Sequence, residues 1–387
     1  MEKLKKVIFI QPHPIHWFSS QFKFIAKNAT FDFEVYYCTK HGLNNQIDSG
    51  FGKRVDFKIP LLEGYNFKFL KNYSFNKNHS DTLFSSVNFD IIPLIFKSPK
   101  ETLFLVHGWS RFTYLLTIFF GKILGRKIGL RAESPITHER KYSKTDRKLR
   151  KIIFKYILFP NIDFFFYIGS QNKYFYKYYG VKENKLKFYP YCVDNEFFRD
   201  KFKNNKKSKK HISGVKKILF VGKLIPKKAP ETLIKAFLKL DYKRAKLIIV
   251  GDGILYDSLN KKYINEIKSG QIELKGFQDQ NALSKFYSNA DIFVLPSGYG
   301  ETWGLVVNEA CNFELPLILS DKVGCSTDLV KGNGYIFKYG DIDDLSNKLQ
   351  LLLKNTNLKT TGKISNMNLK NLNYTNILKT LENLKLN

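Results

Sequence analysis

Short apolar runs alternate with segments of helical periodicity along most of the chain. In the N-terminal half, the apolar runs that predict buried strands occupy residues 5–12, 33–38, 102–108, 127–134 and 163–170. A second series occupies residues 216–224, 245–253, 271–277, 291–297, 316–322 and 334–340. Helical spacing of apolar residues follows at 230–240, 281–290 and 341–354. Continuous apolar strands that alternate with helices predict parallel sheets covered on both faces, so the expected fold class is α/β.

A hydrophilic stretch separates the two series of strands. It has six lysines in the ten residues 201–210, which predicts a solvated linker and hinge at 200–214. At 387 residues the chain exceeds one ordinary core. We therefore expect Rossmann-like, doubly wound domains at 1–199 and 215–370, with an interdomain cleft at the carboxyl ends of their strands. A C-terminal helix at 371–387 is expected to pack back toward the first domain.

The charge of the chain is strongly positive. Sixty-four Lys and Arg residues against 34 Asp and Glu residues give a net charge of +30. Such a charge favours anionic partners, namely phosphates, nucleic acid or an acidic membrane surface. The alternative is a lysine-rich compositional bias, because Asn, Tyr, Phe and Ile are abundant too. No aromatic–basic RNA-binding motif or zinc-ligand spacing supports nucleic acid, so no nucleic-acid partner is expected.

Residues 140–155 combine positive charge with helical spacing. They contain eight Lys or Arg residues and one Asp. An apolar stripe runs beside these charges and consists of Leu149, Ile152, Ile153, Tyr156 and Ile157. A basic amphipathic helix of this kind suits an anionic membrane surface. The alternative, which we favour, is a helix that buries the stripe against the first sheet and exposes its basic face.

The longest apolar stretches, at 111–125 and 151–169, are interrupted by charge, Gly or Pro before they reach the ~20 residues that a spanning helix needs. The first apolar run is too short for a secretion signal. The four cysteines have no paired spacing and suggest buried thiols in a reducing compartment. Together these features predict a cytoplasmic protein, either soluble or peripheral on the inner face of the membrane.

Two glutamates flank the start of a predicted helix in the segment "PSGYGETWGLVVNEACNFELP", residues 296–316. Glu301 follows a strand and a glycine-containing turn, and the helix is expected to begin at Thr302. Free backbone N–H groups at a helix start bind anions. Glu309 would lie roughly 12 Å further along the helix at 1.5 Å per residue. The pair would then address the two ends of one extended ligand such as a nucleotide sugar. The alternative is two surface glutamates on an ordinary amphipathic helix.

Residues 296–321 resemble the nucleotide-sugar-binding motif of glycosyltransferase family 4, whose members are retaining enzymes of the GT-B fold. The core of the motif is Glu-x7-Glu, with Gly-Leu after the first Glu and Ala after the second. Further matching segments follow the family order at 219–237 ("LFVGKLIPKKAPETLIKAF"), 248–253, 274–277, 315–325 and 332–341. The N-terminal half matches more weakly, at 103–110, 129–134 and 167–198, and its first loop lacks the family's common glycine pair.

This resemblance implies a hexosyltransferase-type enzyme that moves a sugar from a nucleotide-diphosphate sugar to a hydroxyl acceptor. The acceptor would be a glycan or a lipid-linked glycan of cell-surface polysaccharide synthesis. Two alternatives stay open: a nucleotide-sugar epimerase or phosphorylase of the same fold, and a non-catalytic binder of nucleic acid or of an anionic membrane. No Asp-x-Asp cluster lies at a strand end, so neither a metal nor another cofactor is expected.

The same resemblance assigns roles in the C-terminal half. Lys223 and Lys228 would neutralise the donor diphosphate, and Lys227 between them is expected to point elsewhere. Glu301 would contact the donor sugar, and Glu309 would bind the ribose hydroxyls. The other positions matched to donor binding are Gly222, Gly253, Gly276, Phe277, Thr302, Trp303, Gly304 and Leu305. The chain departs from the family twice, with Lys223 where Arg is usual and Ala229 where Gly is usual.

In the N-terminal half the candidate residues follow predicted strands. His107 is the best candidate for a polar contact to the donor sugar, although a lone histidine is as often structural. His13 and His16, in the first loop, are weaker candidates for acceptor contacts. Arg131 and Glu133 would line the acceptor side or pair with each other.

Overall fold

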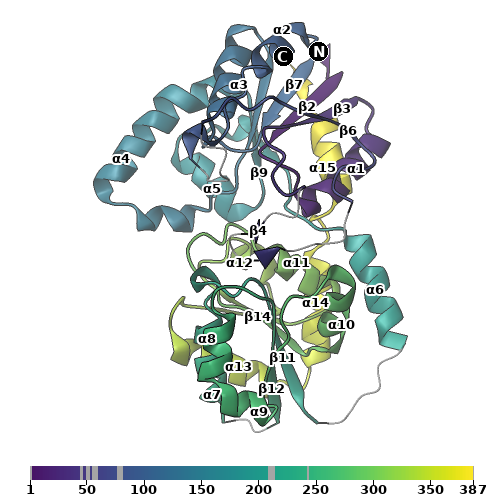
Figure 1. Cartoon of the computed structure of the whole chain (residues 1–387), viewed down its shortest axis with the longest axis vertical. Helices are drawn as coiled ribbons and strands as arrows, with labels where there is room; N and C mark the ends of the chain where they lie inside the picture. The colour runs from purple at the N-terminus through teal and green to yellow at the C-terminus, as the bar shows by residue number, and fades with distance from the viewer. Residues whose placement is uncertain are drawn as a thin grey trace. The chain divides into compact units, whose positions relative to one another are not determined.

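The chain folds into two compact units. The computed structural model describes residues 2–43, 47–48, 53–54, 60–75, 82–207, 214–241 and 244–386. The first unit lies within Met1–Gln46 and Ile59–Tyr191 and includes the C-terminal segment from Tyr374 onward, whereas the second consists mainly of Cys192–Asn373. Figure 1 shows a sheet flanked by helices in each unit. Both units are Rossmann-like, as the alternating pattern predicts.

The first unit is built on a seven-stranded parallel sheet in the order β10-β9-β8-β7-β2-β3-β6. Its strands are β2 (Lys6–Gln11), β3 (Asp32–Tyr37), β6 (Asn66–Phe69), β7 (Thr102–Val106), β8 (Lys127–Arg131), β9 (Phe164–Tyr167) and β10 (Leu186–Phe188). The apolar runs predict all of them except β6 and β10, which are short and partly polar. From β2 the chain adds strands toward one edge of the sheet (β3, β6), and from β7 it adds them toward the other edge (β8, β9, β10). The switch point of this doubly wound sheet therefore lies between β2 and β7.

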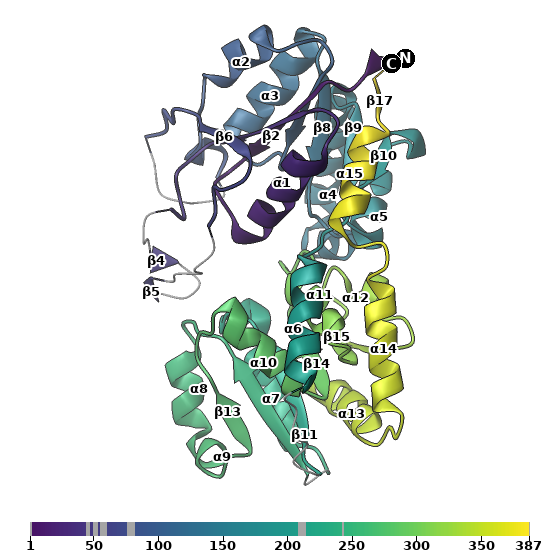
Figure 2. The same ribbon diagram turned by 90° about the vertical axis from the view of Figure 1, so that its right-hand side faces the viewer.

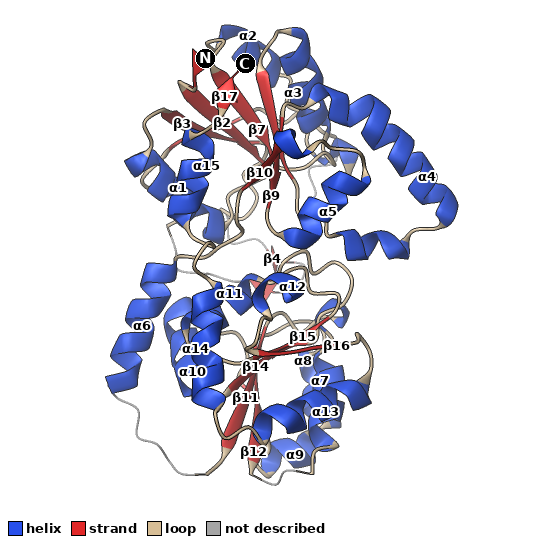
Figure 3. Ribbon diagram, turned by 180° about the vertical axis from the view of Figure 1, so that it is seen from behind, coloured by secondary structure: helices blue, strands red, loops and turns tan. Residues whose placement is uncertain are grey.

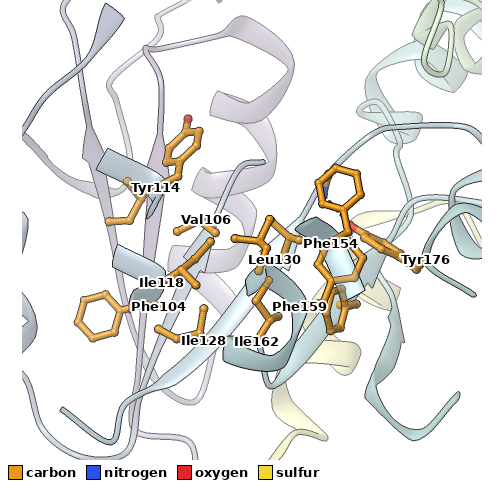
Figure 4. Close-up of a cluster of buried hydrophobic side chains, with 14 of the residues drawn as sticks. Phe104, Val106, Tyr114, Ile118, Ile128, Leu130, Phe154, Phe159, Ile162 and Tyr176 are labelled. Atoms are coloured by element: carbon orange, nitrogen blue, oxygen red, sulfur yellow. Dashed lines mark hydrogen bonds between the residues drawn. The ribbon is translucent and has the colours of Figure 1, made fainter. Parts of the chain in front are cut away.

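Helices cover this sheet because both of its faces are apolar. Successive residues of a strand point to opposite faces. Ile8 belongs to a buried cluster with Ile118 of α3 (Phe112–Ile123), and Figure 4 shows part of this cluster. Phe9 packs instead on Phe22 of α1 (His16–Asn28), with ring centroids 5.2 Å apart. The remaining helices before the switch to the second unit are α2 (Ile91–Lys97), α4 (Lys144–Ile152), the π-helical η3 (Ile153–Leu158) and α5 (Ser170–Tyr178).

The C-terminal segment returns to the first unit, as predicted. Helix α15 (Tyr374–Glu382) packs on α1, and its Thr380 hydroxyl donates to the carbonyl oxygen of Phe188 at 2.6 Å. Strand β17 (Lys385–Leu386) then pairs antiparallel with β1 (Glu2–Lys3). Figure 2 shows α15 alongside α1 and β10.

The second unit is built on a six-stranded parallel sheet in the order β13-β12-β11-β14-β15-β16. Its strands are β11 (Lys216–Val221), β12 (Ala245–Val250), β13 (Ile272–Leu274), β14 (Ile292–Leu295), β15 (Leu317–Ser320) and β16 (Gly334–Phe337), all within predicted runs. Its helices are α6 (Asn195–Lys207), α7 (Pro230–Leu238), α8 (Tyr256–Lys262), α9 (Ile264–Lys268), α10 (Gln280–Asn289), α11 (Leu305–Asn312), α12 (Ser326–Leu329), α13 (Ile342–Leu353) and α14 (Leu358–Asn368). Figure 3 shows helices on both sides of this sheet, whose switch point lies between β11 and β14. A two-stranded pair, β4 (Ile47–Asp48) and β5 (Lys53–Arg54), completes the strands.

The lysine-rich linker predicted at 200–214 is helical over its first part. Helix α6 (Asn195–Lys207) runs into it, and the rest up to residue 213 lies outside the described residues. Phe198 and Phe202 lie one turn apart, and both rings contact Phe313 of the second unit. This apolar pair anchors one face of α6. The many lysines of this segment predicted a linker, so the helical spacing of Phe198 and Phe202 was not recognised from the sequence.

Among the described helices, none is both long enough and apolar enough to cross a bilayer. All four cysteines are buried, as expected, and none forms a disulfide.

Candidate active site

Two loops meet at the switch point of the second sheet. One follows β11 and enters the 3₁₀ turn Pro226–Lys228 before α7, and the other follows β14 and carries Glu301. The Lys228 ammonium donates to the Glu301 carboxylate in an ion pair whose side chains are 14% and 10% exposed. The structure therefore brings together two residues that lie far apart in the sequence, at the edge of the sheet where doubly wound folds bind ligands.

The charge state of Glu301 depends on this pairing. Burial by itself would raise the pKa of Glu301, because a charged carboxylate loses solvation. The ammonium of Lys228, with help from Lys227, outweighs burial and holds the pKa of Glu301 below its ordinary value. Glu301 is thus ionised at neutral pH. Removal of either partner of a buried ion pair is strongly destabilising, because it leaves an uncompensated charge.

Lys227 and Lys223 lie beside this pair. Lys227 Nζ donates to the carbonyl oxygen of Gly300 at 3.2 Å. Partial burial lowers the pKa of Lys227, Glu301 opposes this shift, and the ammonium groups of Lys228 and Lys223 add to it. The expectation that Lys227 points elsewhere is therefore wrong, because the tight 3₁₀ turn directs neighbouring lysines toward the same loop. Lys228 and Lys227 thus act on the Glu301 carboxylate and Lys223 acts on Lys227, so the site carries net positive charge.

Helix α11 begins at Leu305 and not at Thr302 as predicted. Gly304 adopts φ 96°, a left-handed conformation that a right-handed helix cannot contain. Trp303 is buried before it, and its indole N–H donates to Oδ1 of Asn308 at 2.8 Å. Residues 301–304 consequently form a fixed loop, and only Glu309 lies on the helix. The distance that the sequence predicts between Glu301 and Glu309 assumed that both lie on one helix, so that prediction is wrong.

Glu309 is held by a tyrosine that the sequence analysis missed. The hydroxyl of Tyr287, on α10, donates to Glu309 Oε2 at 2.8 Å. Burial raises the pKa of Glu309 to about 7, although the Tyr287 hydrogen bond opposes that shift. Burial and the adjacent carboxylate raise the pKa of Tyr287 well above its ordinary value, so Tyr287 remains a donor. A carboxyl that titrates near neutrality is a candidate ligand-binding group.

Four glycines join the loops that follow β11, β12 and β13. The amide of Gly251 donates to the carbonyl oxygen of Gly276 at 2.8 Å. A Cβ at Gly253 would lie 2.6 Å from the carbonyl oxygen of Leu224, so a side chain cannot fit there. Gly222 faces the stem of Lys228, with Cε 3.7 Å from the position of a Cβ. These glycines have a structural role in loop packing, and a role in nucleotide approach stays a prediction, as it does for Phe277.

Ala229 occupies a position that suits glycine. Its φ of 48° and ψ of 45° place it in the left-handed region, between the lysine turn and α7. A Cβ in that region is unfavourable by roughly 1–2 kcal/mol. The departure from the family pattern at Ala229 therefore carries a conformational cost in this chain.

Ala229→Gly is accordingly expected to stabilise the second unit by roughly 1 kcal/mol, which corresponds to a rise of roughly 2–4 °C in its thermal midpoint. Differential scanning calorimetry would measure this shift. The matched control is Ala236→Gly, since Ala236 is buried within α7 and should lose stability when it is replaced by glycine. A lower midpoint for Ala229→Gly would contradict the strain argument.

In the first unit, polar side chains gather at the ends of β2, β7 and β8. Gln11 Nε2 and Arg131 Nη1 each lie 3.4 Å from His107 Nδ1. Because both are N–H donors, Nδ1 acts as the acceptor, and the proton of a neutral His107 resides on Nε2. Nε2 faces Glu133 Oε1 at 3.5 Å, and Arg131 donates to the same oxygen at 2.6 Å. Gln11 is a member of this cluster that the sequence analysis missed.

Arg131 is fully buried beneath aromatic rings. Its Cζ lies 4.9 Å from the ring centroid of Phe18, 5.5 Å from that of Tyr189 and 4.7 Å from that of Tyr191. Burial would lower the pKa of Arg131, but Glu133 and the tyrosines raise it above its ordinary value. Of the two expectations for Arg131 and Glu133, the structure shows their pairing. Contact with an acceptor stays a prediction.

His13 and His16 lie in the loop after β2 and at the start of α1. The His13 ring packs edge-on against His41 at 5.1 Å, and the His16 ring packs against Trp17 at 4.5 Å. Their roles toward an acceptor stay predictions.

The two sites differ in chemistry. The site of the second unit offers clustered cations, one ionised carboxylate and the N–H groups of the first turn of α11, which lack partners within the helix. It can therefore neutralise a diphosphate. The site of the first unit offers an imidazole that lies between Gln11, Arg131 and Glu133, which suits hydrogen bonding to hydroxyl groups.

The fold and the matched segment define the class of the protein. Two Rossmann-like units with a cationic site at the switch point of the second are the features of the GT-B architecture. Residues 201–366 match the model of the family described as glycosyl transferases group 1. This region contains the whole lysine–glutamate site. The match supports a glycosyltransferase of GT-B fold.

Curated relatives agree with this class. The chain is 29% identical to a sulfoquinovosyl transferase from Arabidopsis thaliana over 44% of its own length and 33% of that protein. It is 27% identical to an alpha-1,4-N-acetyl-D-galactosaminyltransferase from Campylobacter jejuni, over 61% of this chain and 63% of that protein. The described acceptor of the second protein is a glycan on undecaprenol diphosphate. The alignments thus span between about one third and two thirds of these relatives.

Solved structures extend the likeness to the whole fold. HepE from Anabaena, in complex with UDP, superposes with a TM-score of 0.71 at 13% identity over 97% of each chain. A sucrose-phosphate synthase from Thermosynechococcus elongatus gives a TM-score of 0.70 at 17% identity over 97% of this chain and 96% of that one. At such identities the likeness establishes the fold.

Proposed function

We propose that the protein is a retaining glycosyltransferase of family 4 that transfers a sugar from a nucleotide-diphosphate sugar to a hydroxyl acceptor. The observation that carries this proposal is the cluster of Lys223, Lys227, Lys228 and Glu301 at the switch point of the second sheet. Three ammonium groups and one carboxylate leave a net double positive charge. A nucleoside diphosphate sugar carries two negative charges on its diphosphate, so the charges match.

The reaction breaks the bond between the sugar's anomeric carbon and the diphosphate oxygen, and the electron pair departs with the diphosphate. Negative charge grows on that oxygen as the bond breaks, and fixed lysines stabilise it more in the transition state than in the ground state. The acceptor hydroxyl bonds to the same carbon, and its proton passes to the departing diphosphate. We propose that lysines supply the neutralising charge, with no requirement for a metal ion or another cofactor.

The remaining candidate residues fit around this step. Glu309 would accept hydrogen bonds from the ribose hydroxyls, and N–H groups at the start of α11 would bind phosphate or sugar oxygens. His107 of the first unit would contact the donor sugar, while Arg131 and Glu133 would fix that imidazole. A UDP donor is favoured among the bases, because HepE has been solved with UDP and with UDP-glucose.

The proposed acceptor is a glycan or lipid-linked glycan of cell-surface polysaccharide synthesis. Support comes from the Campylobacter relative, whose name specifies an undecaprenol-linked acceptor. A lipid-linked acceptor resides in a membrane while nucleotide sugars are soluble. We therefore propose a cytoplasmic enzyme that works at the inner face of the membrane.

A thermal-shift screen followed by a transfer assay tests the proposal. UDP, GDP, ADP and their sugars should be compared at equal concentration, because a ligand of the folded state raises its apparent stability. We expect one nucleotide to raise the melting temperature and the matching sugar to be transferred to a lipid-linked glycan. Conversion of the donor sugar to its epimer in the absence of an acceptor would indicate an epimerase. Stabilisation by none of these ligands would overturn the proposal.

Donor binding is expected to strengthen as pH rises through about 7, if ionised Glu309 accepts the ribose hydroxyls. The carboxylate fraction of Glu309 grows over that window. For the unliganded protein the sign is opposite, since a raised carboxyl pKa stabilises the folded state at low pH and this contribution is lost as pH rises toward 7. Calorimetric Kd values for UDP on both sides of pH 7, in wild type and Glu309→Gln, would measure the effect. A slope that persists in Glu309→Gln would contradict the assignment.

A further inference from the structure

The apolar stripe along α4 and η3 is exposed. Its side chains are 57% exposed at Leu149, 53% at Ile152, 41% at Ile153, 65% at Tyr156 and 53% at Ile157. The interpretation favoured from the sequence, in which this stripe packs against the first sheet, is therefore wrong. Five large apolar side chains within nine residues face solvent.

The reason is that the core side of this segment is already occupied. Phe154 and Leu158 lie four residues apart in η3 and are buried, and Phe159 follows them into the same cluster. Phe154 and Phe159 stack with ring centroids 5.1 Å apart, and Figure 4 shows both rings in the core. The packing of this segment on the core therefore does not depend on the exposed stripe. Surface patches of this kind on a soluble fold mark interaction sites.

Basic side chains surround the stripe. Lys144, Lys148, Lys151 and Lys155 are exposed, and within the described part of the chain none of them forms an ion pair. Arg150 differs from them because it turns inward and donates to the buried Glu139 at 3.0 Å. The charges beside the stripe are thus left to a partner rather than neutralised within the fold.

The stripe continues onto α5 through Tyr178. This side chain is 42% exposed, and Lys151 Nζ lies 5.4 Å from the centroid of its ring. Figures 1 and 3 show α4 at the outer edge of the first unit, with no other element of that unit over its far side. We call the five stripe residues, Tyr178 and the four lysines the α4 surface.

We propose that the α4 surface docks on an anionic lipid bilayer. Lysines would bind lipid phosphates, while the isoleucines, the leucine and the tyrosine rings would enter the boundary between headgroups and acyl chains, where amphipathic helices bind. A polar surface such as RNA would satisfy the lysines and leave the apolar stripe in water. A second copy of the chain would bring like charges together. The bilayer is the partner that matches both components.

This inference gives the proposed transferase its route to a lipid-linked acceptor, and it rests on the proposed function only in that respect. Vesicle binding requires neither a donor nor catalysis. The two proposals can therefore fail separately in the same set of measurements.

The test is co-sedimentation of the full chain with vesicles of phosphatidylcholine alone or mixed with phosphatidylglycerol. We expect binding to the mixed vesicles only, with an affinity that falls as salt increases. Reversal of Lys144, Lys148, Lys151 and Lys155 to glutamate should weaken binding at least roughly a hundredfold. Ile152→Ser with Ile153→Ser and Ile157→Ser should weaken it as well, and the binding that remains should be more sensitive to salt.

Matched controls lie on the second unit. Reversal of the exposed Lys354, Lys359, Lys363 and Lys370 changes the net charge equally and should leave most vesicle binding intact. Ile254→Ser with Leu351→Ser and Met367→Ser removes exposed apolar side chains elsewhere and should have little effect. All variants should keep the thermal shift with nucleotide, which verifies folding.

Several outcomes would overturn the docking proposal. One is an equal loss of vesicle binding in the α4 variants and in their controls. Others are binding of the protein to neutral vesicles alone, or binding to RNA without binding to vesicles. A change of oligomeric state in the apolar variant would also overturn it. Lost donor turnover with intact vesicle binding would instead count against the proposed function.

Discussion

Replacement of Lys228 by alanine should lower kcat/KM for the nucleotide-sugar donor by roughly 10²–10³-fold, the loss that follows removal of a preorganised electrostatic group. Lys228 is the cation in direct contact with Glu301, and its ammonium is mostly shielded from solvent. The substitution removes positive charge from the departing diphosphate. It also leaves the buried carboxylate of Glu301 unpaired, so that a negative charge faces the leaving group. Steady-state kinetics with a defined acceptor would measure the loss.

A double variant separates these two effects. If Lys228→Ala acts only through an unpaired Glu301, then the double variant with Glu301→Gln should be as active as Glu301→Gln alone. We expect the double variant to be much less active than Glu301→Gln alone, because the cation that the diphosphate needs is still missing. Equal activity of these two variants would reassign Lys228 to a structural role.

A matched ion pair in the same sheet provides the control. Lys246 pairs with Glu273 at 2.7 Å, but it is the second residue of β12 and lies at the amino end of the strand. Lys246→Ala should therefore leave turnover nearly unchanged. Lys223→Arg should also be tolerated, since arginine is usual at that family position and preserves the charge. Equal small losses at Lys228 and Lys246 would contradict the site.

The sheets could be predicted because each central strand is a continuous apolar run. Residues 216–224 or 291–297 can be buried on both faces only inside a helix-covered parallel sheet. The short edge strands β6 and β10 lack such a run, so the sequence did not reveal them. The sequence likewise concealed the helical part of the lysine-rich segment, because two phenylalanines among many lysines decide its packing.

The candidate site could be predicted as a set of residues but not as a geometry. The order of the motifs identifies Lys228 and Glu301 as candidates. Their ion pair, however, depends on β11 and β14 being neighbours in the sheet, although β12 and β13 lie between them in the chain. Gly304 is the N-cap of α11, and its left-handed backbone sets the helix start at Leu305, which the residue pattern after Glu301 does not show. Tyr287 and Gln11 contribute hydrogen bonds from elements that contain no recognisable motif.

The exposure of the stripe on α4 was the hardest feature to predict. A sheet-covering helix and a membrane-binding helix share one periodicity, and the difference lies in which side chains fill the core. Phe154 and Leu158 do so here, one helical turn apart, and their neighbours remain outside. Periodicity alone cannot make that choice between adjacent positions.

The two glutamates of the motif should respond differently to substitution. Glu301→Gln is expected to lower kcat by roughly 10²-fold or more, while Glu309→Ala should mainly raise the donor Kd, by roughly 10–100-fold. Glu301 lies against the Lys228 ammonium beside the diphosphate site, where charge changes during the reaction. Glu309 instead lies on α11 with Tyr287 as its donor, away from the lysines, so its hydrogen bonds would be the same in the ground state and the transition state.

The kinetic parameters distinguish these roles because a group that acts uniformly on ground and transition states alters KM, whereas one that acts on the transition state alters kcat. Calorimetry with UDP supplies the Kd, and initial rates at saturating donor supply kcat. Tyr287→Phe is the matched control: it removes the hydroxyl that orients Glu309 and should raise Kd by less than Glu309→Ala, with kcat unchanged. If Glu301→Gln and Glu309→Ala produce equal and small changes in both parameters, the paired glutamates are ordinary residues of the loop and helix. The catalytic assignment would then have to move away from this edge of the sheet.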